Sequence, residues 1–272
     1  MMSIEFKNKV VVVTGAAKGI GEASARLFAQ LGGSVALLDR DAECGERTAA
    51  SIVSGGGRAR FFACDVSKAD EVKGAVSDVR TIFGGVDVLV SNAGIQEYGD
   101  VVTTSEELWD KVMNVNLKSC FLMSKNVVPS MIERGGGAIV VVGSVQSMSA
   151  IGNSVAYVTA KHGLLGLVRA MALDYAGKGI RVNCVCPGAI DTPMLRWAAS
   201  LDANPEKVIE TCDRMHAMGR IGKADEVAQA IAYLASPWAS FVTGAALLVD
   251  GGMLVPAGGM GFQESGTGAA TK

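Results

Sequence analysis

Short runs of aliphatic and β-branched residues alternate along the chain with longer segments of helical periodicity. The runs predict seven strands, at residues 9–14, 34–39, 59–64, 86–91, 138–143, 180–185 and 246–249. The clearest of them, KVVVVT and AIVVVG, are apolar throughout and do not alternate with polar residues. Strands of this kind are buried on both faces of a sheet.

The segments between the strands repeat apolar residues at the spacing of a helix with one buried face. They predict helices at 19–31, 42–53, 68–83, 105–133, 156–176 and 224–235. Strands that alternate with helices form right-handed βαβ units, which build a parallel sheet. We therefore expect an α/β fold in which residues 1–252 form a single domain around a doubly wound, seven-stranded parallel sheet.

Two segments fall outside this alternation. Residues 190–222 form an irregular insertion between the sixth strand and the last long helix. The C-terminal tail, residues 253–272, is rich in glycine and carries only two charges. We expect the first part of the tail to pack at a subunit interface or over a neighbour's pocket, and its last ten or so residues to be disordered.

Composition and charge exclude several classes of protein. The 272 residues are 49% hydrophobic and 19% charged, which supplies a large core and argues against disorder as the main state. The net charge of −2 leaves no basic surplus, so we expect neither nucleic acid nor an anionic membrane as a partner. The charge-free stretch 135–160 contains Gln146, Asn153 and several glycines, unlike a membrane-spanning helix. No apolar leader with a cleavage site opens the chain, so we expect a cytoplasmic protein.

Cysteines and histidines give little sign of a disulfide framework or a metal site. The six cysteines show no C-x-x-C spacing, and we expect reduced, mostly buried thiols and no metal. Cys184 and Cys186, two apart on a strand, are expected to point to opposite faces. We interpret His162 as structural. His216 lies in the insertion, where it is either structural or within reach of a bound ligand.

A glycine-rich turn joins the first strand to the first helix. In TGAAKGIG, Gly15, Gly19 and Gly21 follow the spacing G-x-x-x-G-x-G, with Lys18 and Ile20 between them. Glycines allow a tight turn and a close approach of a pyrophosphate, and the helix N-terminus offers free N–H groups. The turn therefore indicates a Rossmann-type dinucleotide site, although an ordinary strand-to-helix turn can also carry such glycines.

An acidic residue supports the dinucleotide interpretation. Asp39 ends the second strand, 18 residues after Gly21. A carboxylate at this position accepts both ribose hydroxyls of NAD and repels the 2′-phosphate of NADP. Lys18 and Arg40 are cations that favour NADP. Because Asp39 itself ends the strand, we predict NAD as the cofactor, with NADP less favoured.

A tyrosine and a lysine four residues apart begin the helix at 156–176. The spacing puts Tyr157 and Lys161 on one helix face. A tyrosine titrates near pH ~10, so it exchanges protons at neutral pH only where a cation stabilises its phenolate. Such pairs are also common on exposed helices, but Ser144 follows a buried strand and so lies at the carboxyl edge of the sheet, where ligands bind.

Together these motifs resemble the short-chain dehydrogenase/reductase family in its single-domain form. The resemblance covers residues 7–252 in the order typical of the family. It is carried by TGAAKGIG, Asp39, Asp65-Val66, Asn92-Ala93-Gly94, Asn116, Ser144, Tyr157-x-x-x-Lys161 and Pro187-Gly188.

The resemblance implies a role for each matching position. Tyr157 is the general acid/base, Lys161 assists it and holds the nicotinamide ribose, Ser144 donates to the substrate oxygen, and Asn116 holds a water in a proton relay. Asp65 and Val66 contact adenine, Asn92 lies on the adenosine side of the cofactor, and Ile190 and Thr192 contact the carboxamide. The expected cofactor contacts are Gly15, Lys18, Gly19, Ile20, Gly21, Asp39, Arg40, Asp65, Val66, Asn92, Ala93, Gly94, Tyr157, Lys161, Pro187, Gly188, Ile190 and Thr192.

The resemblance also places a substrate pocket beneath the loop at 190–222. Its expected lining is Gln96, Ser144, Gln146, Asn153, Met194 and Trp197. Amides and an aromatic ring suit a hydroxylated molecule, although several of these residues could equally pack the loop. The helices at 105–133 and 156–176 resemble subunit-packing helices of the family, and Gly163, Gly166 and Ala170 keep one face of the second thin, so we expect a homotetramer.

The predicted function is hydride transfer between NAD and a secondary alcohol or carbonyl of a sugar, polyol or other small hydroxylated molecule. One alternative is a 3-oxoacyl thioester reductase, which usually favours NADPH and docks an acidic carrier protein. Asp39 and the balanced charge argue against it. The other is a nicotinamide-sensing binding protein, a class that typically loses the tyrosine or lysine kept here as Tyr157 and Lys161.

Overall fold

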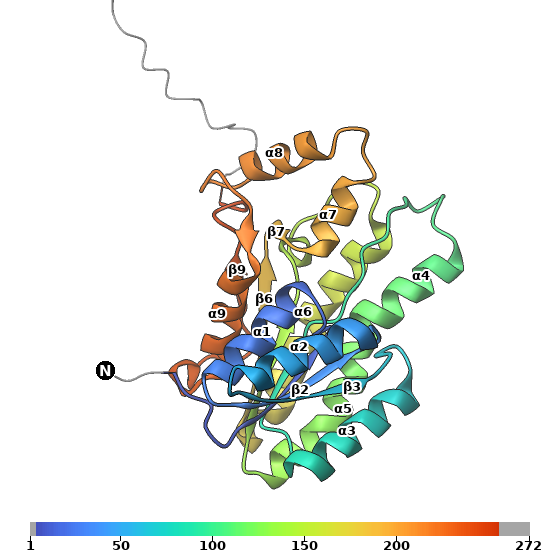
Figure 1. Ribbon diagram of the computed structural model, residues 1–272. Helices are drawn as coiled ribbons and strands as arrows, with labels where there is room; N and C mark the ends of the chain where they lie inside the picture. The colour runs from blue at the N-terminus through green and yellow to red at the C-terminus, as the bar shows by residue number, and fades with distance from the viewer. Residues whose placement is uncertain (1–3, 256–272) are drawn as a thin grey trace, which may run out of the picture.

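A computed structural model describes residues 4–255. Its centre is a seven-stranded parallel sheet with strand order β3-β2-β1-β4-β5-β6-β9 (Figure 1). The expected fold class is therefore confirmed. The strands are β1 (Val10–Thr14), β2 (Ser34–Asp39), β3 (Arg58–Ala63), β4 (Val88–Ser91), β5 (Gly137–Val142), β6 (Ile180–Pro187) and β9 (Ala246–Val249).

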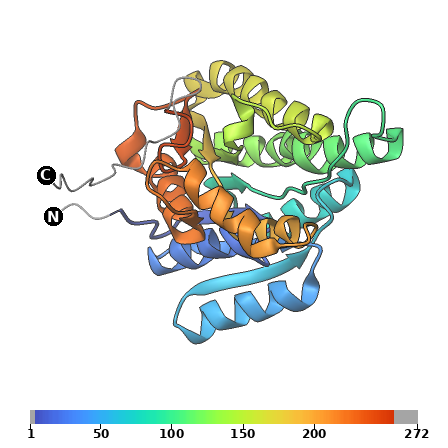
Figure 2. The ribbon, with the colours of Figure 1, turned by 90° about the horizontal axis from the view of Figure 1, so that it is seen from above.

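Helices cover both faces of this sheet, as the view from above shows (Figure 2). One face carries α1 (Gly19–Gln30), α2 (Ala42–Ser54) and α9 (Ala224–Ala235). The other carries α3 (Ala69–Phe83), α5 (Ser119–Glu133) and α6 (Val155–Tyr175). The helix α4 (Glu106–Met113) precedes α5 and packs against α6.

Burial on both faces explains the uninterrupted apolar strands. Val10 and Val12 of β1 face the cluster under α3, α5 and α6, whereas Val11 and Val13 face the cluster under α1, α2 and α9. All four side chains are at most 4% exposed. Full burial of a valine contributes roughly 1.5 kcal/mol or more, so a central strand such as β1 is stabilised by an apolar residue at every position.

A π-helical turn interrupts the helix that was predicted as continuous over 105–133. Residues Asn114–Lys118 form this turn between α4 and α5, and Asn116 lies inside it, 2% exposed. Apolar periodicity does not reveal one extra residue per turn, so the sequence pattern could not indicate it. Such turns occur frequently at functional sites.

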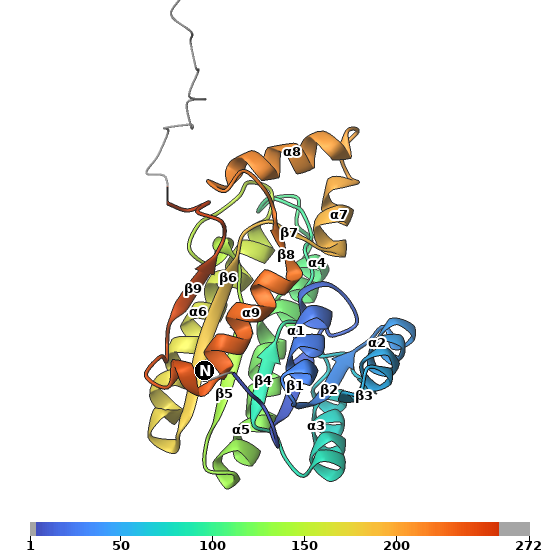
Figure 3. The ribbon, with the colours of Figure 1, turned by 60° about the vertical axis from the view of Figure 1, so that its left-hand side comes forward.

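The insertion at 190–222 is ordered, which corrects the expectation of an irregular segment. It begins with β7 (Ile190–Asp191) and contains α7 (Pro193–Ala199) and α8 (Pro205–Met215). It ends at β8 (Gly222–Lys223), which pairs with β7. Thr192 and Asn204 cap the two helices, each followed by proline, the usual start signal of a helix. Both helices lie above the carboxyl ends of the strands (Figure 3).

Cys184 and Cys186 correct a second expectation. Both lie on β6, and their Sγ atoms are 3.7 Å apart on the same face of the strand. Side chains two apart on a strand share a face, so the prediction of opposite faces was wrong. All six cysteines are free, as expected.

The predicted disorder at the chain end concerns residues that lie within 256–272, outside the described residues. Among residues 4–255, no helix is long and apolar enough to cross a membrane.

A buried carboxylate joins the amino ends of β1 and β4. Asp87 accepts hydrogen bonds from the Val10 N–H at 2.8 Å and from the Arg134 guanidinium at 2.9 and 3.1 Å, and it pairs with Lys9 at 3.3 Å. Burial raises the pKa of Asp87, but these donors and charges outweigh burial and hold the pKa below its ordinary value.

We expect Asp87→Asn to lower the free energy of unfolding by about 2 kcal/mol at neutral pH, because a buried charged acceptor is lost. The unfolded-state pKa of aspartate is about 3.9, so the stabilisation is present above about pH 4. It is lost as the pH falls through the lower folded-state value. Urea unfolding of both proteins at pH 7 and pH 3 measures this. A stability difference independent of pH would contradict the assignment.

Candidate active site

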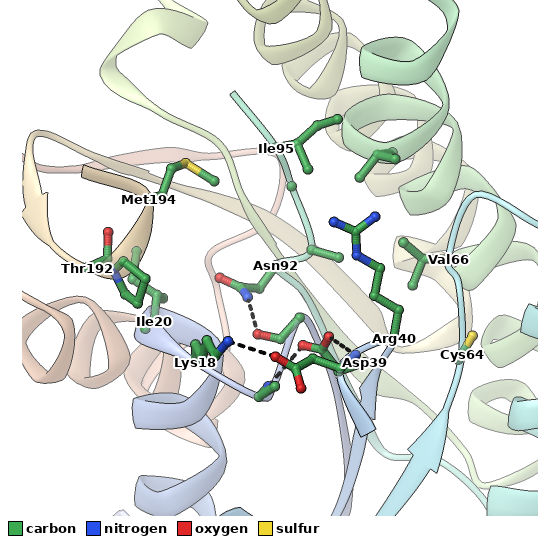
Figure 4. A pocket seen from close by; sticks show the side chains of 18 of the residues that line it. Lys18, Ile20, Asp39, Arg40, Cys64, Val66, Asn92, Ile95, Thr192 and Met194 are labelled. Atoms are coloured by element: carbon green, nitrogen blue, oxygen red, sulfur yellow. Dashed lines mark hydrogen bonds and ion pairs between the residues drawn. The ribbon is translucent and has the colours of Figure 1, made fainter. Parts of the chain in front are cut away.

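A cavity of about 350 Å³ opens where the strand order reverses, at the carboxyl ends of β1 and β4 (Figure 4). Ligands of open α/β sheets bind at this switch point. Twelve of the expected cofactor contacts line the cavity: Gly15, Lys18, Gly19, Ile20, Asp39, Arg40, Asp65, Val66, Asn92, Ala93, Gly94 and Thr192.

The turn after β1 has the shape of a phosphate cradle. Gly15 and Gly19 adopt φ values of 63° and 60°, which favour glycine. Gly21 lies behind the turn and does not line the cavity; a Cβ atom there would overlap the Gly15 carbonyl oxygen. Asn92 Nδ2 donates to the Thr14 and Gly15 carbonyls at 2.9 and 3.2 Å, so β4 holds this turn in place.

Two carboxylates, Asp39 at the end of β2 and Asp41 just after it, lie at the edge of this cavity. Asp39 accepts hydrogen bonds from the N–H groups of Ala17 at 2.9 Å and Asp41 at 3.0 Å. Asp41 in turn pairs with Lys18 at 2.7 Å, and the hydrogen bond from Lys18 lowers the pKa of Asp41 to about 2. The charge of Lys18 is therefore compensated by a carboxylate, and Arg40 extends along the cavity in Figure 4.

A second cavity of about 350 Å³ adjoins the first at Ile20, Asn92, Gly94, Thr192 and Met194, which line both. It contains all four expected catalytic residues, Asn116, Ser144, Tyr157 and Lys161. Each of the four is at most 8% exposed. The expected contacts Pro187, Gly188 and Ile190 also line it, so the sequence motifs from six separate segments meet here.

Helix α6 carries the tyrosine and lysine on one face, as their spacing predicts. Lys161 Nζ donates to the Val142 carbonyl at the end of β5, at 2.9 Å, and lies 5.5 Å from the centre of the Tyr157 ring. Ser144 lies two residues after the end of β5. Its Oγ accepts from the Gln146 N–H at 3.2 Å, and the 3.4 Å contact with Gln146 Oε1 is long enough for the hydroxyl to redirect toward a ligand.

The π-helical turn brings Asn116 to the same site. Its side chain pairs with the backbone of Ile95 in both directions, each at 2.9 Å. A Cβ on Gly94 would lie 2.7 Å from Asn116 Oδ1 and 3.8 Å from Lys161 Nζ, so these two side chains flank the same glycine. The arrangement can move a proton between a ligand oxygen, the phenol and the ammonium.

Comparisons with known proteins agree with this geometry. A family model described as enoyl-(acyl carrier protein) reductase matches residues 15–254. A 2-(S)-hydroxypropyl-CoM dehydrogenase of Xanthobacter autotrophicus is 40% identical over 253 residues, which cover 93% of this chain and 99% of the relative. The chain belongs to the short-chain dehydrogenase/reductase family.

Two further short-chain dehydrogenase/reductase relatives cover the chain almost fully. A cyclohexanol dehydrogenase of Acinetobacter sp. strain SE19 is 41% identical over 92% of this chain and 97% of the relative. The ligand-free structure of an aldohexose dehydrogenase from Thermoplasma acidophilum matches with a TM-score of 0.87 and 40% identity, covering 94% of this chain and 97% of that one. The resemblance drawn from the motifs is thus confirmed; the family uses nicotinamide cofactors, and relatives act on alcohol or carbonyl groups.

The second cavity of this short-chain dehydrogenase/reductase, where the sequence places the substrate, has a mostly apolar lining. Gln96, Gln146 and Met194 line the second cavity with Ser144, as expected. The remaining wall comes from Tyr98, Ile151, Leu195, Ala198, Val208, Cys212, Met215 and Met253. Of these eight residues, none was singled out from the sequence. Those from α7, α8 and the chain after β9 reach the cavity only through contacts between distant segments of the folded chain.

Asn153 and Trp197, two expected pocket residues, do not line this cavity. Asn153 has a left-handed backbone with φ of 57°, and its carbonyl accepts from the Gly99 N–H at 2.9 Å. Trp197 is 42% exposed and stacks on Tyr98, with ring centroids 6.3 Å apart. Both residues thus contact the loop that carries Tyr98. This agrees with the alternative given above, that some of the expected pocket residues pack the loop.

The two histidines lie outside the cavity. His216 is 3% exposed, and its Nε2 must accept from the Ala189 N–H at 3.1 Å. Nδ1 therefore carries the proton and donates to the Cys212 carbonyl at 2.7 Å. His216 joins α8 to the segment after β6, a structural role. His162 is exposed, with Nδ1 3.0 Å from the Val158 carbonyl.

Proposed function

We propose that this protein is an NAD-dependent oxidoreductase that interconverts a secondary alcohol and the corresponding carbonyl on a small hydroxylated molecule. The observation that carries the proposal is the meeting of Ser144, Tyr157 and Lys161, all nearly buried, in a cavity that adjoins the dinucleotide cleft. Low exposure strengthens every electrostatic interaction with a reacting oxygen.

The residues fit a nicotinamide dinucleotide. The cradle at Gly15 and Gly19 would hold the pyrophosphate, Asp39 the adenosine ribose, and Ile190 and Thr192 the carboxamide. When bound, the nicotinamide supplies or accepts the hydride.

The protein moves the proton. In the oxidation direction Tyr157 takes the hydroxyl proton of the substrate, and in the reduction direction it returns a proton to the carbonyl oxygen. Ser144 donates a hydrogen bond to that oxygen where negative charge develops. The Lys161 ammonium stabilises the phenolate. Asn116, which lies beside the same glycine, Gly94, would hold a water through which the proton passes to solvent.

The apolar wall favours a substrate whose carbon framework is compact and largely hydrophobic. Aliphatic side chains from α7 and α8 offer no hydrogen bonds to a ring that carries hydroxyls at every carbon. Amides at Gln96 and Gln146 supply the few polar contacts. The proposed class therefore includes cyclic secondary alcohols and lightly hydroxylated molecules ahead of free sugars.

A nicotinamide-absorbance assay of the purified chain tests the function directly. We expect turnover with NAD and cyclic secondary alcohols to exceed turnover with aldoses and with linear primary alcohols. The absence of NAD- or NADP-dependent turnover with all alcohols and carbonyls would refute the assignment.

Asp39 supports NAD as the cofactor, because its carboxylate repels a 2′-phosphate and Asp41 compensates the charge of Lys18, one of the two cations that line this cavity. Asp39→Ala should lower kcat/KM for NAD relative to NADP by about 100-fold, since a charged hydrogen bond contributes about 1.5–3 kcal/mol. The ratio is measured by initial rates with each cofactor. Asp78→Ala, on the exposed face of α3, is the matched control. An unchanged ratio in Asp39→Ala would remove this residue from cofactor choice.

The acyl-thioester alternative keeps some support from the family model, whose description names an acyl-carrier substrate. An acetoacetyl thioester with NADPH in the same assay distinguishes the two functions. A higher kcat/KM with the thioester and NADPH than with any alcohol and NAD would favour the alternative. The intact Tyr157 and Lys161 argue against a nicotinamide-sensing binding protein.

We also propose a homotetramer. Gly166 and Ala170 are exposed on α6, and Leu173 beside them is 84% exposed, an apolar strip that suits a second copy. Gly163 serves a different purpose, since a Cβ there would meet Leu117 within the same chain at 2.8 Å. Light scattering at micromolar concentration tests the assembly, and a stable monomer would refute it.

A further inference from the structure

A second phenol lies in the substrate cavity and has no part in the proton transfer described above. Tyr98 belongs to the loop after β4, and its Oη accepts a hydrogen bond from Gln96 Nε2 at 3.1 Å. Both residues are half-buried and line the cavity that contains Tyr157.

The hydroxyl hydrogen of Tyr98 is available to a ligand. A tyrosine hydroxyl has one hydrogen to donate, and the lone pair facing Gln96 is already used. Within residues 4–255, the Tyr98 hydroxyl donates no hydrogen bond; the one side-chain hydrogen bond it takes part in is the one it accepts from Gln96. Leaving a donor unpaired in an apolar surrounding is costly, so a ligand acceptor would be stabilised here.

Tyr98 is also held in place and held protonated. Its ring stacks on Trp197 of α7 at an interplanar angle of 17°. Burial raises the pKa of Tyr98, and the neighbouring Tyr157 and Cys212 raise it further. Tyr98 therefore acts as a fixed hydrogen-bond donor, not as a second base.

Because the rest of the cavity wall is mostly apolar, this donor can discriminate between ligands with one oxygen and ligands with two. Beside Tyr98 the cavity presents aliphatic or thioether side chains, from Ile151, Met194, Leu195, Ala198, Val208, Met215 and Met253. A ligand with a single oxygen uses that oxygen at Ser144 and Tyr157 and leaves Tyr98 unpaired. A ligand with a second oxygen pairs both positions, and a site built to bond an oxygen discriminates against analogues that lack it.

We propose that Tyr98 is a specificity-determining residue that donates a hydrogen bond to a second oxygen of the substrate. The substrate class is then a compact, mostly apolar diol, hydroxyketone or diketone. The inference rests on the proposed oxidoreductase function, because it assigns the reacting oxygen to Ser144 and Tyr157.

The test compares cyclohexanol with the 1,2-, 1,3- and 1,4-cyclohexanediols in NAD-dependent assays of the wild type and Tyr98→Phe. We expect at least one diol to exceed cyclohexanol in kcat/KM by about tenfold, in line with one hydrogen bond. Tyr98→Phe keeps the stacked ring and should remove this advantage, lowering kcat/KM for that diol by about tenfold more than kcat/KM for cyclohexanol. Tyr233→Phe on α9 makes the same chemical change outside the cavity and should alter neither.

Two results would overturn the proposal: no diol exceeds cyclohexanol, or Tyr98→Phe lowers both substrate types equally, as expected if Tyr98 only shapes the wall. Calorimetric titration of the protein with the same ligands separates this failure from failure of the proposed function. Tighter diol binding that depends on Tyr98 would support the second-oxygen site even if no alcohol is turned over, and equal binding of cyclohexanol and all diols would exclude it.

Discussion

Tyr157→Phe is expected to lower kcat by about 10³-fold while leaving the affinity for NAD within about twofold. General acid–base catalysis by a positioned side chain contributes roughly 10²–10⁴-fold, and the phenol oxygen is the proposed site of proton transfer. The ring itself is 7% exposed and packs with Val112, Ala156 and Ala160. Phenylalanine keeps this packing, so the fold should be retained.

The measurement pairs initial rates with a binding titration of the cofactor. Circular dichroism and thermal unfolding establish that Tyr157→Phe is folded, and Tyr175→Phe, at the far end of α6, removes a phenol oxygen away from the cavity. A kcat within tenfold of the wild type would show that another group transfers the proton. Loss of cofactor binding in step with kcat would instead make Tyr157 a binding residue.

The sheet was predictable because its central strands, such as β1 and β5, are apolar throughout. Strands buried on both faces must be apolar throughout, and β9 and α9 coincide with their predicted ranges, 246–249 and 224–235. The π-helical turn at Asn114–Lys118 was not predictable, since the apolar spacing around it still resembles a regular helix. The helices α7 and α8 carried cap and proline signals at Thr192 and Asn204, but α7 spans only seven residues, too few to show a helical period.

The candidate site also has a part that could be predicted from the sequence and a part that could not. Asp39 and Pro187 end strands of a parallel sheet and Ser144 follows one, so they meet at one edge whatever the loops do. Tyr98 could not be assigned in advance, because its contact with Trp197 depends on where the insertion folds. Local motifs therefore specify the proposed reacting centre, while the proposed substrate wall depends on contacts between distant segments.

The glycine turn gives the second large prediction. Gly21→Ala should lower NAD affinity by about 100-fold and the free energy of unfolding by roughly 1–3 kcal/mol, because overpacking displaces backbone here. The added methyl would overlap the Gly15 carbonyl and approach Asn92 Nδ2 to 2.6 Å. Neither neighbour can move freely, since Asn92 also bonds the Thr14 carbonyl. The turn that presents N–H groups to a pyrophosphate must therefore shift.

Gly74→Ala is the matched control, because it makes the same substitution on α3 where nothing lies within 4 Å of the new methyl. Alanine is the better helix former by about 0.8–1.0 kcal/mol, so Gly74→Ala should stabilise the protein and leave NAD affinity unchanged. Urea unfolding and cofactor titration of both variants separate helix propensity from the steric effect. If Gly21→Ala bound NAD as tightly as Gly74→Ala, the close approach of Gly21 to Gly15 would not be what shapes the cofactor turn.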